Sequence, residues 1–180
     1  MEKLKLFPKI LFFISLSSLS IWIGANFVKV SLLFNLFQPL PNLPLKSLYS
    51  NLFNNDAVNF NSWFTILKPI FSITVITFYV YVVFQVLFLL FSRINIKNNG
   101  WIFLSLILTV ILLGFELYLN NFDMKLISSN NINPKDTVEL IRLRINKIPN
   151  FVYAEILMGL TILFLMIFQP LVKKEKNAEL

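Results

Sequence analysis

The sequence predicts an all-α fold: a polytopic integral membrane protein with four transmembrane helices and a short amphipathic external helix before the last span. Hydrophobic residues make up 57% of the chain and charged residues only 14%, whereas a soluble domain carries about 25% charged residues. The apolar residues gather in four long runs, and a water-soluble fold of this length could not bury so much apolar surface. We therefore expect residues 1–180 to form a single membrane domain.

The first span is predicted at residues 10–37. Lys9 and Lys29 enclose a stretch without charge, and about twenty residues at about 1.5 Å each cover the roughly 30 Å of hydrocarbon in a bilayer. A cleavable signal peptide also combines a basic start with an apolar run, but no Ala-x-Ala cleavage site follows this one. Prolines between residues 38 and 44 end the helix, because proline lacks an amide N–H, and residues 38–68 are the first external loop.

Two further spans are predicted at residues 69–92 and 101–119. The earlier of the two is rich in Val, Ile, Phe and Thr, which favour strands in water. In lipid, however, every backbone polar group must be satisfied within the segment, and a helix achieves this. A basic turn at residues 93–100 joins the two spans, and Glu116 is the one charged residue in the later span.

The second external segment is predicted at residues 120–149. Apolar residues recur at helical spacing within residues 134–148, so we expect an amphipathic helix on the membrane surface before the chain turns inward. The fourth span follows at residues 150–172, contains Glu155 and leads into several lysines.

The placement of basic residues favours a multi-pass protein of the cell membrane with a cytoplasmic N-terminus and a cytoplasmic C-terminus. The 16 Lys and Arg residues divide evenly between the two sides. Those at the termini and in residues 93–100, however, are packed into short segments that touch the spans, where the positive-inside rule applies. The net charge of +7 suits anionic lipid. The lipid bilayer is therefore an expected partner and nucleic acid is not.

Charged residues inside the predicted spans are the most informative feature of the sequence. Counting at about 1.5 Å per residue brings Lys29, Glu116 and Glu155 to one shallow layer in the outer leaflet, with Lys68 nearby. Asn26 lies one turn below Lys29 and can bond a carboxylate across the bundle. Two lysines and two glutamates neutralise one another, so we expect a paired cluster that lines a binding site or joins the helices. The alternative is that the lysines extend to the interface and the glutamates reach interfacial water.

The first span also carries a face of small residues, formed by Ser17, Ser20 and Gly24. Ser20 and Gly24 stand at the spacing typical of closely packed membrane helices, because small side chains let two backbones approach. We expect this face to contact another helix, either within the bundle or in another membrane protein subunit.

The residue inventory argues against several kinds of chemistry. The chain has no cysteine and no histidine, which removes the usual ligands of soft metals and haem and the usual general base near neutral pH. No phosphate-binding loop, dinucleotide-binding motif or hydrolase motif is present. We therefore expect no catalytic residue, no metal and no cofactor.

Residues 21–34 have the sequence Ile-Trp-Ile-Gly-Ala-Asn-Phe-Val-Lys-Val-Ser-Leu-Leu-Phe. This stretch resembles the opening helix of small four-helix bacterial membrane proteins of uncharacterised function. The likeness consists of an aromatic-x-Gly pattern, Trp22 and Gly24, ahead of an external loop that contains prolines. It implies a four-helix bundle in a bacterial inner membrane, and it assigns no functional residue to this chain.

Three functions fit these observations, and we rank them in the following order. The first is a non-enzymatic small subunit or assembly or accessory factor of a membrane complex, because catalytic groups are lacking and the first span has a small-residue face. The second is a small transporter or binding protein that uses the charged layer for an ion or polar solute. The third is a membrane enzyme acting on lipid or quinone, with Glu116 or Glu155 as the acid or base.

Overall fold

The described part of the chain folds into helices. The computed structural model describes residues 5–36, 57–92, 94–128 and 151–170. Its elements in chain order are α1 (Leu6–Leu36), α3 (Ala57–Ser92), the short 3-10 helix η1 (Ile96–Asn98), α4 (Gly100–Ser128) and α6 (Phe151–Phe168). No strand occurs in these residues. The predicted all-α fold is confirmed for this part of the chain, and the predicted amphipathic helix at residues 134–148 lies outside it.

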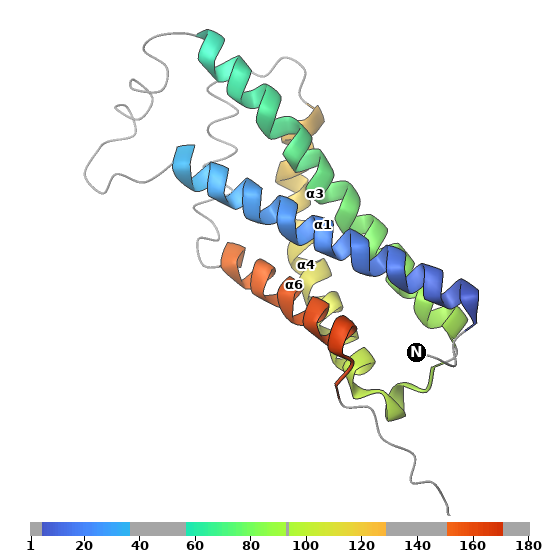
Figure 1. The fold of residues 1–180 in the computed structure, drawn as a ribbon. Coiled ribbons are helices and arrows are strands. Elements are labelled where there is room, and N and C mark those ends of the chain that lie inside the picture. Colours follow the sequence, from blue (N-terminus) through green and yellow to red (C-terminus); the bar gives the residue numbers. More distant parts are fainter. Residues whose placement is uncertain (1–4, 37–56, 93, 129–150, 171–180) are drawn as a thin grey trace, which may run out of the picture.

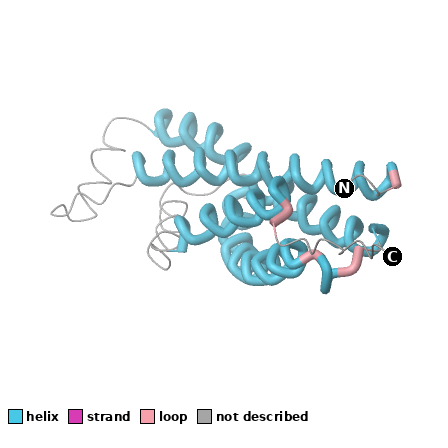
Figure 2. The backbone as a smooth tube through the Cα atoms, turned by 60° about the horizontal axis from the view of Figure 1, so that its bottom comes forward, coloured by secondary structure: helices cyan, strands magenta, loops and turns pink. Residues whose placement is uncertain are grey.

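The four long helices lie side by side, and each runs opposite to the one before it (Figure 1, Figure 2). The start of α1, the link around η1 and the end of α6 gather at one end of the bundle, called here the N-terminal end (Figure 1). The end of α1, the start of α3, the end of α4 and the start of α6 lie toward the opposite end, called here the far end.

Helices α1 and α3 form the most extensive contact of the bundle. The ring centroids of Phe12 and Phe88 lie 5.2 Å apart, and those of Trp22 and Phe78 lie 5.4 Å apart. Residue numbers rise along α1 as they fall along α3, so the pair is antiparallel with one constant register over more than two turns.

Three of the helices are long and apolar enough to span a membrane, over Leu6–Leu32, Thr65–Ser92 and Gly100–Ser128. The fourth, α6, is equally apolar in character but shorter. At its end, Gln169 adopts a left-handed backbone with φ of 47° and donates its N–H to the Leu165 carbonyl at 3.0 Å. This cap, followed by Pro170, ends the helix before residue 172, where the sequence predicts the end of the span.

Two helices continue beyond their predicted ends at the far end of the bundle. The sequence predicts an external loop up to residue 68, but α3 already begins at Ala57 and passes through Pro69. The sequence also predicts that the chain leaves the membrane after Leu119, but α4 continues to Ser128. Two of the polar residues that suggested an exit point, Asn120 and Asp123, are buried against the other helices, and their side chains therefore extend the bundle instead of ending it.

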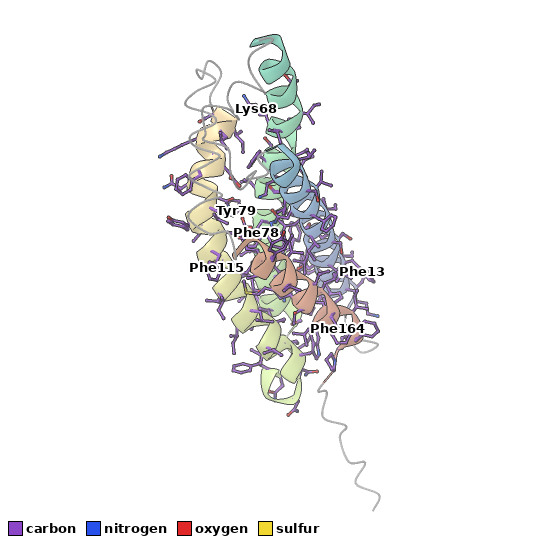
Figure 3. The ribbon with its side chains drawn as sticks, turned by 90° about the vertical axis from the view of Figure 1, so that its left-hand side faces the viewer. Phe13, Lys68, Phe78, Tyr79, Phe115 and Phe164 are labelled. Carbon is purple, nitrogen blue, oxygen red and sulfur yellow. The ribbon has the colours of Figure 1, made fainter. Side chains whose placement is uncertain are left out.

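Apolar side chains cover the outside of the described bundle as well as its core. Large hydrophobic residues are exposed along all four helices, and Phe13 of α1 and Phe164 of α6 lie on the outer surface (Figure 3). The buried residues, in contrast, include serine, threonine, asparagine, lysine and glutamate. An apolar exterior around a partly polar interior is the distribution expected of helices surrounded by lipid.

Trp22 of α1 lies close against the backbone of α6 at Gly159. Trp22 is completely buried, and a Cβ atom placed on Gly159 would lie 2.6 Å from Trp22 Cζ3 and 3.1 Å from Ile23 Cγ1. Only glycine lets the indole ring lie this close to the α6 backbone. The residue pair therefore sets the distance between the two helices.

We predict that Gly159→Ala destabilises the bundle by about 1–3 kcal/mol, the usual effect of overpacking a core. Thermal unfolding in detergent measures this loss, and adding Trp22→Phe should restore part of it because the smaller ring leaves room for the methyl group. Gly24→Ala is the matched control, since nothing lies within 4 Å of a Cβ at that position. Equal stability of the Gly159 and Gly24 variants would contradict the contact.

Candidate functional site

The interior of the bundle contains one concentration of charged and amide side chains, called here the buried polar layer. All of its members are at most 4% exposed, and all four long helices contribute to it. The layer consists of Asn26, Lys29, Thr74, Glu116, Asn120, Asp123 and Glu155.

Contacts near the middle of the bundle show that members from α1 and α6 lie at the same height. Asn26 lies one turn after Trp22 on α1, and Glu155 lies one turn before Gly159 on α6. Trp22 and Gly159 touch, and the two helices run in opposite directions (Figure 1). Both steps therefore lead toward the far end by about 6 Å, which brings Asn26 and Glu155 to about the same level.

The same reasoning aligns α3 with α4. The hydroxyl groups of Tyr81 and Thr109 are 2.6 Å apart and share a hydrogen bond. Thr74 lies seven residues before Tyr81, and Glu116 lies seven residues after Thr109. Because these helices are antiparallel, both steps move about two turns toward the far end. Thr74 and Glu116 therefore lie at a common level as well.

Lys29 connects these helices at the next turn. Its ammonium group is 3.4 Å from Asp123 Oδ2 and 3.5 Å from Thr74 Oγ1, and it lies 5.6 Å from the centroid of the Phe71 ring. Lys29 is 1% exposed and Asp123 is fully buried. Burial of each charge is therefore offset by attraction to the other. An ammonium group has three N–H donors, and Lys29 directs two of them at Asp123 and Thr74.

The structure places four of the five predicted site residues in the buried polar layer: Asn26, Lys29, Glu116 and Glu155. Lys68 is partly exposed and lies about 9 Å beyond Thr74 along α3, toward the far end (Figure 3). The alternative that Lys29 extends to the interface does not hold within this bundle, because its side chain points into the interior.

Sequence reasoning missed Asp123, the acidic partner of Lys29. The residue falls in the segment predicted to be external, after two consecutive asparagines. Its spacing contains the missing signal: Glu116, Asn120 and Asp123 stand four and three residues apart, which puts them on one helix face. Extending the helical pattern of the third span by one more turn would have brought Asp123 to the depth of Lys29.

Two amide side chains in the layer retain hydrogen-bonding capacity. Neither the Nδ2 nor the Oδ1 atom of Asn26 has a hydrogen-bond partner in the part of the chain that the structure describes. Asn120 donates its Nδ2 to the Tyr79 hydroxyl at 3.3 Å, but its Oδ1 has no partner there. Buried polar atoms of proteins almost always have a partner, so these atoms are exceptions that call for an explanation.

The buried polar layer combines three carboxylates, from Glu116, Asp123 and Glu155, with the single ammonium group of Lys29. Among the described residues, no three acidic side chains are close enough together to hold a metal ion. The groups present can accept hydrogen bonds, exchange protons and balance a small charge. The chemistry of the layer is therefore that of polar binding and proton exchange.

The small-residue face of α1 lies on the outer surface of the described bundle. Ser17, Ser20 and Gly24 are exposed, and the Ser20 hydroxyl donates to the Leu16 carbonyl of its own helix at 2.9 Å. Nothing lies within 4 Å of a Cβ placed on Gly24. No described helix of this chain packs against the face, and its contact with another subunit stays a prediction.

Comparisons of the chain with protein-family models, with curated proteins and with solved structures find no match. The resemblance of residues 21–34 to small four-helix bacterial membrane proteins stays a likeness of sequence pattern.

We predict that Lys29→Met and Asp123→Asn each destabilise the protein by about 3–5 kcal/mol, because each leaves a buried charge without its counter-charge. The double variant should lose less than the sum of the two, and thermal unfolding of single and double variants in detergent measures this coupling. Lys125→Met, on the exposed face of α4, is the control and should change little. Strictly additive losses would contradict the ion pair.

Proposed function

We propose that this chain is a four-span protein of the cell membrane that binds a small ion or polar solute in the buried polar layer, without catalysing a reaction. Three helices have the length and apolar character of membrane spans. The 18 residues of α6 cover about 27 Å, which is close to the thickness of the hydrocarbon core. We therefore count α6 as the fourth span.

An even number of spans brings both ends of the chain to one side of the membrane. In the described bundle, the start of α1 and the end of α6 lie at the same end (Figure 1, Figure 2). The short basic segments next to the spans belong to this end in the sequence, which favours a cytoplasmic location for it under the positive-inside rule. The buried polar layer would then lie in the outer half of a bacterial inner membrane.

The side chain of Asn26 is the observation that carries the binding proposal. It is 1% exposed, and both of its polar atoms are without a partner in the described residues. Leaving a buried hydrogen-bonding group unsatisfied costs about 1–3 kcal/mol. A ligand that offers one donor and one acceptor would remove this cost, and the neighbouring carboxylates and ammonium group would orient it.

The sequence alone favours the accessory role. With the buried polar layer in view, we favour solute binding instead. A cluster that served only to hold the helices together would be expected to satisfy its own hydrogen bonds. Here Asn26 and Asn120 keep unused capacity, and the contacts of Lys29 are long. The layer therefore has the composition of a site that is completed by a ligand.

We predict that at least one of three probes, ammonium chloride, sodium chloride or acetamide, raises the unfolding temperature of the purified protein in detergent above that in choline chloride. A ligand at a hundred times its Kd stabilises by about 2.7 kcal/mol, so the shift should reach several degrees. Asn26→Leu should abolish the shift, whereas Asn121→Leu on the exposed face of α4 should retain it. No shift with any probe, or an equal shift in Asn26→Leu, would contradict binding in the layer.

A second candidate function is that of an accessory subunit of a membrane complex. The observation that favours it is the exposed face of Ser17, Ser20 and Gly24 on α1, which has the form of a surface for close helix packing. This face points away from the buried polar layer, so the two functions do not exclude one another.

For this second function, we predict that Gly24→Leu releases a subunit, or a second copy of the chain, that co-purifies with the parent protein in mild detergent. A Cβ at position 24 meets nothing within 4 Å among the described residues and the position is exposed, so the thermal stability of the isolated protein should not change. Gly114→Leu is the matched control, because that glycine also has open space around it. A constant subunit composition in all three proteins, measured by size-exclusion chromatography with light scattering, would show that the face contacts lipid.

A further inference from the structure

The outer surface of the described bundle carries three exposed tyrosines, each on a different helix. They are Tyr79 of α3, Tyr118 of α4 and Tyr153 of α6, which are 39%, 47% and 55% exposed. Tyr118 lies two residues beyond Glu116 toward the far end, and Tyr153 lies two residues beyond Glu155 in the same direction. Each of these two tyrosines therefore stands about 3 Å beyond a glutamate of the buried polar layer.

The buried polar layer is one level across all four long helices. The Trp22 ring of α1 lies against Gly159 of α6, and its centroid is 5.4 Å from that of the Phe78 ring of α3. One turn further toward the far end, these three helices carry Asn26, Glu155 and Thr74. Thr74 is also level with Glu116 of α4. The two tyrosines that follow the glutamates therefore lie at one height.

Tyr79 brings its hydroxyl to this height from a Cα atom nearer the N-terminal end. Side chains of an α-helix lean toward the start of the helix, and α3 starts at the far end (Figure 1). The Tyr79 hydroxyl accordingly accepts a hydrogen bond from Asn120 Nδ2 at 3.3 Å. Asn120 lies one turn after Glu116, and its side chain leans back toward that residue because α4 runs the other way. We call Tyr79, Tyr118 and Tyr153 the tyrosine belt.

From Lys9 to the tyrosine belt, the outside of the described bundle is apolar. The described residues expose no charged side chain over this interval, and large apolar side chains such as Phe13 and Phe164 cover it (Figure 3). The exposed hydroxyls of Ser20 and Thr161 donate to carbonyls of their own helices at 2.9 Å and 2.8 Å. The lack of exposed charge and the internal satisfaction of these two hydroxyls both suit contact with lipid tails.

The apolar interval is about as long as the hydrocarbon core of a membrane is thick. On α1, Lys9 lies about 25 Å from Asn26, and the belt is about 3 Å further on. On α4, Gly100 lies about 27 Å from Tyr118. The hydrocarbon core of a bilayer is about 30 Å thick. Tyrosine is enriched at its boundaries, because the ring is apolar and the hydroxyl is polar.

Helices α3 and α4 continue beyond the tyrosine belt toward the far end. Ser128 lies about 15 Å beyond Tyr118 along α4. The exposed side chains of this part of α4 are mixed in character, since Asn121 and Lys125 alternate with Met124. A mixed surface suits the polar headgroup region and the water outside it, which the hydrocarbon core excludes.

We infer that the tyrosine belt lies at the headgroup boundary of one leaflet, so that the buried polar layer is level with this boundary and not with the middle of the lipid tails. The inference rests on the four-span arrangement in the proposed function, and it deepens that function by naming the side of approach. A polar solute reaches the layer from the headgroup region without crossing the hydrocarbon. The ion pair with Lys29 fits this position, because Asp123 lies about 7 Å beyond Tyr118 along α4.

The chain has no cysteine, which allows a test by site-directed spin labelling of the full-length protein. The labelled protein is reconstituted in vesicles of phosphatidylcholine and phosphatidylglycerol. Oxygen concentrates in the hydrocarbon and a nickel chelate stays in water, so the ratio of their collision rates with the label measures its depth. Single cysteines replace exposed residues that form one stripe along α4, namely Ile107, Val110, Gly114, Asn121 and Lys125.

The ratio of oxygen to nickel collisions should be highest at Ile107 and Val110, which lie about midway between Gly100 and Tyr118. It should fall at Gly114 and Asn121 and be lowest at Lys125. If the bilayer were instead centred on the whole of α4, the maximum would lie at Gly114, the midpoint of Gly100–Ser128.

Two exposed positions on α6 are matched controls, because they lie level with positions on the α4 stripe. Phe164 is level with Ile107, and Leu157 is level with Gly114. Cysteine variants at two level positions should give the same ratio, and they supply the measurement again if one of the α4 variants folds poorly.

A maximum at Gly114 or beyond it would place the buried polar layer among the lipid tails. That result would overturn the inference and leave the four spans intact. High nickel collision rates at all positions would show that the bundle does not lie in lipid, which would overturn the four-span arrangement as well. The thermal shifts with ammonium, sodium or acetamide are measured in detergent, so they test the solute site separately from either result.

Discussion

The charge of Lys29 is the constraint on which the rest of the bundle depends. A fully buried ammonium group is costly without a counter-charge, and the structure supplies Asp123 from a helix that is distant in sequence. The Thr74 hydroxyl and the Phe71 ring of α3 complete its surroundings. The Lys29 side chain therefore contacts both α3 and α4, and these contacts fix how the three helices are aligned along the bundle axis. The extra turns of α4 beyond its predicted end also follow, because they are needed to bring Asp123 to the lysine.

Apolar packing and polar contacts have separate tasks in this protein. Aromatic pairs such as Phe12 with Phe88 and Trp22 with Phe78 set the register of α1 against α3, and the glycine at position 159 sets the distance to α6. The polar residues then occupy the space that the aromatic residues leave at the centre. As a result, the interior can hold charge without losing a defined geometry.

The sequence predicts the helical class and the common level of several buried charges along the bundle, but not their pairing. The level of a residue follows from counting along its helix, which is why Lys29, Glu116 and Glu155 could be assigned to one region in advance. Pairing depends on which helix faces which, and local sequence does not contain this information. For the same reason the small-residue pattern predicts helix packing at Gly24, whereas the glycine that another helix contacts is Gly159. The role of Gly159 becomes visible only in the structure, which places Trp22 opposite it.

The pairing of Lys29 with Asp123 also has a consequence for biogenesis. The two residues are separated by 94 positions in the chain, and ribosomes add about 5–20 residues per second, so the lysine emerges about 5–20 s before its partner. During that interval Lys29 has no counter-charge from α4, and its long side chain is free to extend toward polar surroundings. The ion pair that joins α1 to α4 therefore forms only after α4 has been synthesised.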